Sequence, residues 1–238
     1  MTSSLAIPSS HDELYYARGD VPLTRPLMQG DVFKDVAIPG IDDHRELAMV
    51  MMHPCSMRTG PTLRKRLTVV RVDRQPTLSL AQWPDTHYDY MPLPDLKGEG
   101  IDTSPFASCF RDIGSVATTD LGLKKRIAIL STRGLLYLQQ RYIHSQTRVV
   151  VDLETLLAQM EPVFDEIELQ EDWADAALGA NEKSDEEIVA SIQLAEREFQ
   201  KFLSDSDDDL REGLKNQFRR TEIRRAVRKE IDKRYPDN

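Results

Sequence analysis

Charge is divided unevenly along this chain of 238 residues, and the division limits how its last third can fold. Residues 1–150 contain 18 basic and 16 acidic side chains, whereas residues 151–209 contain 19 acidic and only 3 basic ones. Residues 210–238 then contain 10 basic and 5 acidic side chains. An acidic segment that precedes a basic one can fold back on it or face a different partner, although most such charges lie on solvated helix faces. The sequence therefore predicts three zones of different electrostatic character.

Residues 25–130 have the pattern of a small β domain. Apolar and polar residues alternate over 31–38, the segment 45–53 contains a continuous apolar run at 47–52, and β-branched residues dominate 67–72. Loops without a helix join these three segments, which favours an antiparallel, strongly bent sheet or barrel. We expect strands at residues 31–38, 45–53, 67–72 and 109–116, and residues 126–130 are expected to form either a further strand or the lead into a helix.

The segments on either side of the β region differ in character. Residues 1–24 contain several Ser, Pro and Gly residues, and their one clustered apolar feature is Leu14-Tyr15-Tyr16, which predicts a flexible N-terminal arm. Residues 131–179 are expected to form packed helices. Ser131 and Asp152 are suitable N-caps, because the side chains of both can accept a hydrogen bond from a free backbone N–H.

Residues 180–238 predict a charged helical arm or a helical hairpin. Ser184 and Glu187 have the spacing of a capping box, which predicts the start of a helix with an apolar stripe. A second apolar stripe begins at Leu210, continues at every fourth residue to Phe218 and resumes at Ile223. Isolated helices of this length are marginal in water, so the arm must dock on the β domain, on itself or on a partner. We expect residues 184–235 to bind a protein partner or to mediate self-association. The candidate partner-binding residues form an apolar seam and are Ile188, Ile192, Phe199 and Phe202. The predicted fold class is α+β, a small SH3-like antiparallel β-barrel followed by this helical C-terminal extension.

Several classes of protein are excluded by what the sequence lacks. It has no apolar run near the roughly 18 residues that a membrane span needs, and its first residues do not resemble a signal peptide. We therefore expect a cytoplasmic protein without a membrane partner. Phosphate-loop, nucleophile-elbow and zinc-protease motifs are also absent. We expect no cofactor and no metal, since the spacing of Cys55, Cys109 and the histidines does not support a zinc site.

Positive charge is concentrated in one part of the β region. Six basic residues lie within 17 positions, from Arg58 to Arg74. Such a patch on a small barrel is the electrostatic footprint expected for binding a phosphate backbone. An equally good interpretation is an edge strand that carries cations against aggregation. The candidate nucleic-acid-binding residues are Arg58, Arg64, Lys65, Arg66 and Arg71.

The densest chemistry in the sequence lies at His53–Gly60, where an imidazole, a thiol, a hydroxyl and a guanidinium follow a predicted strand. Loops at strand ends often carry functional residues. A Cys–His nucleophile pair is disfavoured, because Pro54 lies between His53 and Cys55 and spoils the geometry. His53 is nevertheless the most available acid or base in this region.

The order of features from Arg25 to Ile143 resembles the MazF/PemK family of small SH3-like barrels, most of which are toxin endoribonucleases. The matching pieces are Gly30-Asp31-Val32, the apolar strand 48–52, the strand 67–72, and Phe110-Arg111-Asp112-Ile113 followed by 126–131 before a helix. The family has an Arg-Pro pair entering the second strand, with the arginine in catalysis. Here Glu46 follows Arg45, so the resemblance assigns a role to the arginine alone.

The resemblance implies a nucleic-acid-acting protein, either a metal-independent RNA-cleaving toxin relative or a catalytically degenerate one. The RNA 2′-hydroxyl would be the internal nucleophile, Arg45 would stabilise the pentacoordinate phosphate, and His53 would act as acid or base. The alternative hypothesis is a non-catalytic assembly or regulatory protein. In that hypothesis both the barrel and the charged helical arm bind protein partners.

Overall fold

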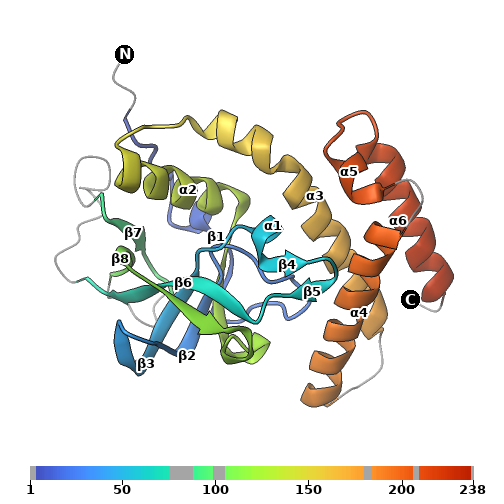
Figure 1. Ribbon diagram of the computed structural model, residues 1–238, viewed down its shortest axis with the longest axis horizontal. Coiled ribbons are helices and arrows are strands. Elements are labelled where there is room, and N and C mark those ends of the chain that lie inside the picture. The colour runs from blue at the N-terminus through green and yellow to red at the C-terminus, as the bar shows by residue number, and fades with distance from the viewer. Residues whose placement is uncertain (1–3, 76–87, 99–104, 180–183, 206–208, 237–238) are drawn as a thin grey trace. The chain divides into compact units, whose positions relative to one another are not determined.

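The computed structural model of the chain describes residues 4–75, 88–98, 105–179, 184–205 and 209–236 (Figure 1). It contains an antiparallel, curled seven-stranded sheet and about six helices. The chain divides into two compact units, and the last change between them along the sequence follows Gln159. Unit 1 consists of Met1–Val21, Leu27–Met57 and Arg64–Gln159, and unit 2 of Pro22–Pro26, Arg58–Leu63 and Met160–Asn238.

The large sheet lies in unit 1, and its strands have the order β1-β9-β2-β3-β6-β8-β7. Every neighbouring pair is antiparallel. The strands are β1 (Tyr15–Arg18), β2 (Val32–Ile38), β3 (Asp42–Val50), β6 (Arg66–Arg74), β7 (Tyr90–Leu93), β8 (Phe106–Ala117) and β9 (Arg126–Leu130). The expected strands at 31–38, 67–72 and 109–116 are thus confirmed to within three residues at each end. Of the two alternatives for 126–130, the strand is the one that forms.

Two features of the sheet explain its curl. Register shifts interrupt the ladders that β2 forms with β3 and β6 forms with β8, and such irregularities bend a strand. Gly114 in β8 lies against Ile38 at the end of β2, so closely that a Cβ at Gly114 would be 2.3 Å from the Ile38 Cγ2. Only glycine permits this approach of two strands that are not hydrogen-bonded neighbours.

The sequence prediction missed the edge strand β1. Residues 12–18, which we placed in a flexible arm, form the short 3-10 helix η1 (Asp12–Leu14) and β1, and β1 pairs with β9. Leu14 is completely buried. The expected strand at 45–53 exists but is shifted by three residues at each end, because β3 extends from Asp42 to Val50 and Pro54 begins the short helix α1 (Pro54–Met57).

Helix α2 (Thr132–Thr147) completes the core of unit 1. The Ser131 hydroxyl accepts a hydrogen bond from the Gly134 N–H at 2.9 Å, which confirms the predicted N-cap. A Cβ at Gly134 would lie 2.1 Å from the backbone oxygen of Leu14, so the backbones of α2 and η1 are in direct contact. The side chains of Leu135, Leu136 and Leu138 are buried.

Unit 2 is built mainly from helices α3 (Leu153–Leu178, which begins in unit 1), α4 (Asp185–Asp205), α5 (Leu210–Leu214) and α6 (Arg220–Arg234). The predicted caps are confirmed: Asp152 accepts the Thr155 N–H at 2.8 Å, and Ser184 and Glu187 form the reciprocal capping box. The second apolar stripe is interrupted, because the chain turns between α5 and α6 and leaves Phe218 exposed. None of the helices in the described part of the chain has the length and apolar character of a membrane span.

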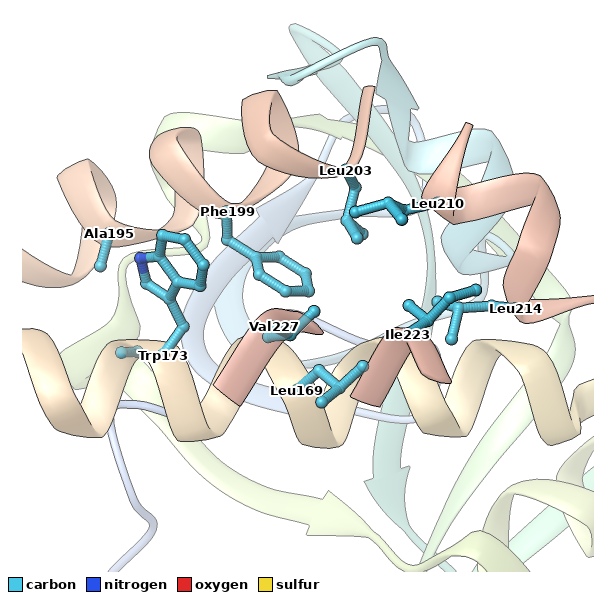
Figure 2. Packing of buried hydrophobic residues seen from close by; sticks show 10 residues of the cluster. Leu169, Trp173, Ala195, Phe199, Leu203, Leu210, Leu214, Ile223 and Val227 are labelled. Carbon is cyan, nitrogen blue, oxygen red and sulfur yellow. The ribbon is translucent and has the colours of Figure 1, made fainter. Parts of the chain in front are cut away.

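The core of unit 2 draws on all four helices (Figure 2). The rings of Trp173 from α3 and Phe199 from α4 lie 5.7 Å apart, nearly edge to face. Helix α5 adds two leucines, and α6 adds Ile223 and Val227. The buried cluster consists of Leu169, Trp173, Ala174, Ala195, Phe199, Leu203, Leu210, Leu214, Ile223 and Val227.

The uneven charge of the sequence is explained within unit 2, where the acidic helix α3 pairs with the basic helix α6. Arg220 lies 2.7 Å from Glu161 and 3.5 Å from Asp165. One turn later Arg224 pairs with Asp165 and with Glu168. Because both helices present charge at a spacing of three or four residues, oppositely charged rows meet along their length. The acidic zone and the basic tail thus fold on each other.

Candidate nucleic-acid interface

Three consecutive cations, Arg64, Lys65 and Arg66, connect the small strand β5 (Thr62–Leu63) to β6, and we call them the basic segment. Their backbone is fixed on both sides. The Arg64 N–H donates to the Met57 carbonyl at 2.8 Å, and the Thr118 N–H donates to the Lys65 carbonyl at 3.0 Å. The Thr118 hydroxyl also donates to the Arg64 carbonyl. The basic segment is therefore a fixed part of unit 1, although its three side chains are exposed.

Among the residues that the structure describes, no acid neutralises the positive charges of the basic segment. Arg66 donates to the Ser115 hydroxyl at 3.1 Å and to the Ser115 carbonyl, which are both uncharged acceptors. Within the described ranges, no ion pair joins a carboxylate to Arg64, Lys65 or Arg66. An anion that approaches this surface therefore meets three cations without having to displace a carboxylate.

Arg71, also a predicted phosphate contact, has a different environment. Its guanidinium donates twice to the Asp112 Oδ2, at 2.9 and 2.6 Å, and lies 3.7 Å from Asp73. Burial alone would lower the pKa of Arg71, but the hydrogen bonds and charges of these acids raise it. Two carboxylates thus compensate one cation, which argues against the predicted role of Arg71 in binding phosphate.

Arg58 lies in unit 2, in the two-residue strand β4 (Arg58–Thr59) that pairs with β5. Its guanidinium is bound to Glu196 of α4, which also accepts a hydrogen bond from the Gln170 side chain at 3.1 Å. Burial lowers the pKa of Arg58 to about 10, despite the opposing effect of nearby Glu166. This arginine is half-buried and already paired with a carboxylate within unit 2, so the structure does not support its predicted contact with nucleic acid.

His53 precedes α1 and has the position of an N-cap. Its Nδ1 accepts a hydrogen bond from the Cys55 N–H at 3.2 Å, and burial lowers the pKa of the imidazole. An acceptor Nδ1 places the proton of the neutral ring on Nε2. In this state Nε2 cannot accept a proton, so the geometry disfavours His53 as a general base. Pro54 occupies the first helical position, where its missing N–H costs nothing.

The second predicted catalytic residue, Arg45, belongs to β3, and its side chain is outside the described part of the structure. Among the residues that are described, no group of three or more His, Cys, Asp and Glu side chains is arranged to hold a metal ion.

The predicted partner-binding residues lie on α4, and two of them, Phe199 and Phe202, pack in the core of unit 2. Phe199 is completely buried, Ile192 is 6% exposed, and Phe202 packs against the same cluster. The ring of Phe202 lies 5.5 Å from that of Trp173. Ile188 is half-buried. These side chains stabilise the unit itself, which argues against the predicted role of this seam in binding a partner.

Sequence reasoning found the basic segment but missed the residues that fix it. Thr118 and Ser115 lie about 50 residues after it, and neither belongs to a recognisable motif. The sequence also gave no sign that Arg58, among the six clustered cations, would be buried. The interpretation of the basic segment as protection for an edge strand is not supported, because β6 pairs with β3 on one side and β8 on the other.

Comparisons with known proteins do not assign the chain to a family. No family model matches the sequence, and a search of curated proteins found no significant match.

Proposed function

We propose that the chain is an RNA-binding protein with an SH3-like barrel in unit 1, related to the MazF/PemK family but degenerate in its cleavage chemistry. The basic segment binds the phosphate backbone of a single strand. The observation that carries this proposal is a contrast within the basic patch. Arg64, Lys65 and Arg66 are exposed and have no acid partner among the described residues, whereas Arg58 and Arg71 are each paired with a carboxylate.

Physical chemistry supports this assignment. When a cation neutralises a phosphate, condensed counterions are released, and this release drives binding without any need for a deep pocket. The fixed backbone of the basic segment also reduces the entropy that is lost on binding, since only the side chains must become ordered. A carboxylate beside each cation would remove most of this gain.

The architecture is compatible with the proposed barrel. Strands β2, β3, β6, β8 and β9 are contiguous in the curled sheet, and the close approach of Gly114 to Ile38 brings β8 against β2. Contact between non-neighbouring strands is the first step in closing a sheet into a barrel.

The proposed loss of cleavage follows from His53. Cleavage by the RNA 2′-hydroxyl needs a group that removes its proton, and the Nε2 of His53 already carries a proton when Nδ1 accepts from Cys55. We therefore expect labelled RNA to be bound and released intact. Cleavage that is abolished by His53→Asn at unchanged thermal stability would instead restore the enzymatic hypothesis.

Replacing Arg64, Lys65 and Arg66 together by Gln tests the binding site. Each phosphate contact to a single strand contributes about 0.7 to the slope of log affinity against log salt, so the slope should fall by about 2. Binding of a fluorescently labelled single-stranded RNA is measured by anisotropy at several salt concentrations.

The matched control replaces three exposed cations of unit 1 that are scattered, namely Lys34, Arg111 and Arg133, by Gln. This variant has the same net charge as the test variant but retains the basic segment. If the two variants bind RNA with equal affinity and equal salt slope, only total charge matters and the proposed site is wrong. If both bind as the parent protein does, the protein-binding alternative gains instead.

A further inference from the structure

The turn between α5 and α6 displays a large aromatic side chain to solvent. Phe218 is 86% exposed, more than any other large apolar residue among those described; the next are Val149, at 55%, and Leu194 and Ile7, at 51%. Burial of a benzyl group is favourable, so the folded chain forgoes this stabilisation at position 218. The exposed ring is accessible to a ligand.

The turn is held in one conformation. The Asn216 side chain accepts the Phe218 N–H at 3.0 Å, and the Asn216 carbonyl accepts the Arg219 N–H at 2.9 Å and the Arg220 N–H at 3.2 Å. Gly213 permits this arrangement, since a Cβ there would lie 2.5 Å from the Ile223 Cδ1. Phe218 is thus displayed by a rigid support, and binding to it costs little conformational entropy.

A shallow polar hollow lies within the same turn. Its residues include two cations, Lys215 and Arg219, against one acid, Glu212. Lys215 lies 2.6 Å from Glu212 and is exposed, so this surface pair is weak and can be exchanged for a stronger anion. The hollow is lined by Glu212, Gly213, Lys215, Asn216, Gln217 and Arg219.

We propose that the α5–α6 turn is a nucleotide-binding site for single-stranded nucleic acid. One base stacks on the ring of Phe218, and the adjoining phosphate lies in the hollow, where Lys215 and Arg219 compensate its charge. An aromatic platform beside cations is the combination with which proteins bind unpaired bases, and the stacking tolerates any base because each has a π-face. The inference rests on the proposed function only for the choice of RNA as the nucleic acid.

Phe218→Trp provides a direct test, because stacking of a base quenches the fluorescence of an indole. The two natural tryptophans give the baseline, which is measured in the parent protein under the same conditions. We expect oligouridylate to quench the added tryptophan and inorganic polyphosphate, which has charge but no bases, to leave it unchanged. Equal responses to both probes, or no response to oligouridylate, would overturn the inference.

Affinity provides the second measurement. Stacking contributes about 1–3 kcal/mol per base, so Phe218→Ala should weaken oligouridylate binding about 5- to 150-fold without changing the salt slope. Leu194→Ala is the matched control, because Leu194 is an exposed apolar residue of the same unit. Equal affinity of Phe218→Ala and Leu194→Ala proteins would also contradict the site.

The two proposals fail separately. Loss of the salt slope in the Arg64, Lys65 and Arg66 variant with no quenching at position 218 would retain the basic segment and overturn the nucleotide site. Quenching that survives the triple substitution, with an unchanged salt slope, would retain the nucleotide site and overturn the basic segment. Binding of a protein by the parent chain that Phe218→Ala abolishes, without any effect on oligouridylate, would assign the turn to a protein partner instead.

Discussion

The guanidinium of Arg126 lies 2.9 Å from the carboxylate of Asp31, and water reaches neither side chain. Asp31 precedes β2, Arg126 begins β9, and Asp31 also accepts the Met28 N–H at 3.1 Å. A buried ion pair adds little net stability, but removal of one partner leaves a charge without compensation in the interior. The pair therefore fixes how β2 and β9 align at this point.

Arg126→Met should lower the free energy of unfolding by about 3–5 kcal/mol, because Asp31 would remain as an isolated buried charge. Urea denaturation measures the change. The control is Arg111→Met, which breaks the pair of an exposed arginine with Asp89 and should cost no more than about 1 kcal/mol. Similar losses in the two variants would mean that Asp31 does not depend on Arg126.

Charge reversal on α6 should distinguish paired from unpaired positions. Arg224→Glu removes contacts with Asp165 and Glu168 and introduces repulsion, so we expect a loss of about 1–2 kcal/mol. The adjacent Arg225 is exposed, and Arg225→Glu should change stability by less than about 0.5 kcal/mol. The difference between these variants should shrink in 1 M salt, which screens surface charges. A difference independent of salt would contradict the electrostatic explanation.

Truncation of two apolar residues of α4 should lower the stability of the protein by very different amounts. Phe199→Ala should destabilise the protein by about 3–5 kcal/mol, because it leaves a cavity beside Trp173 in the four-helix cluster. Leu194 is 51% exposed, so Leu194→Ala should stay within about 0.5 kcal/mol. Thermal unfolding of both proteins measures this. Comparable midpoints would place Phe199 at a surface, as the sequence prediction of a partner-facing seam required.

Glu13 should make stability depend on acidic pH. Burial alone would raise its pKa, but hydrogen bonds from Ser9, Tyr137 and Arg133 more than offset this and lower the pKa to about 2. Since the folded pKa lies below the unfolded value near 4.5, the stabilisation is complete above pH 4.5 and is lost as the pH falls from 4.5 toward 2. Glu13→Gln should flatten the dependence of the thermal midpoint on pH in that window. An unchanged profile would show that Glu13 does not contribute to it.

Local signals in the sequence predicted local structure well. The capping box at Ser184 and Glu187 and the cap at Ser131 were foreseeable because all the interacting groups lie within a few residues. Strand β1 was not, since four residues become a strand only through their partner β9, more than 100 positions away. Phe218 continues the spacing of Leu210 and Leu214, and only the turn after α5 moves it out of the core.

The sequence predicted that the candidate interface would be basic, but it did not predict which cations would belong to it. A run of cations indicated an anion-binding surface, yet which cations remain available depends on acids from distant segments. Asp112 lies 41 residues after Arg71, and Glu196 lies 138 residues after Arg58. No periodicity or motif connects such pairs, because the tertiary fold alone brings them together.

The long separation between Arg58 and Glu196 also limits the order in which parts of the nascent chain can fold. The hairpin that carries Arg58 leaves the ribosome 138 residues before its acidic partner. At about 5–20 residues per second, it must wait about 7–28 s for that partner to be synthesised. During this interval β3 and β6, which precede and follow the hairpin, can pair with each other. The hairpin itself cannot yet bind Glu196. Slowing translation after α3 should prolong this state and the period in which chaperones or proteases can act on it.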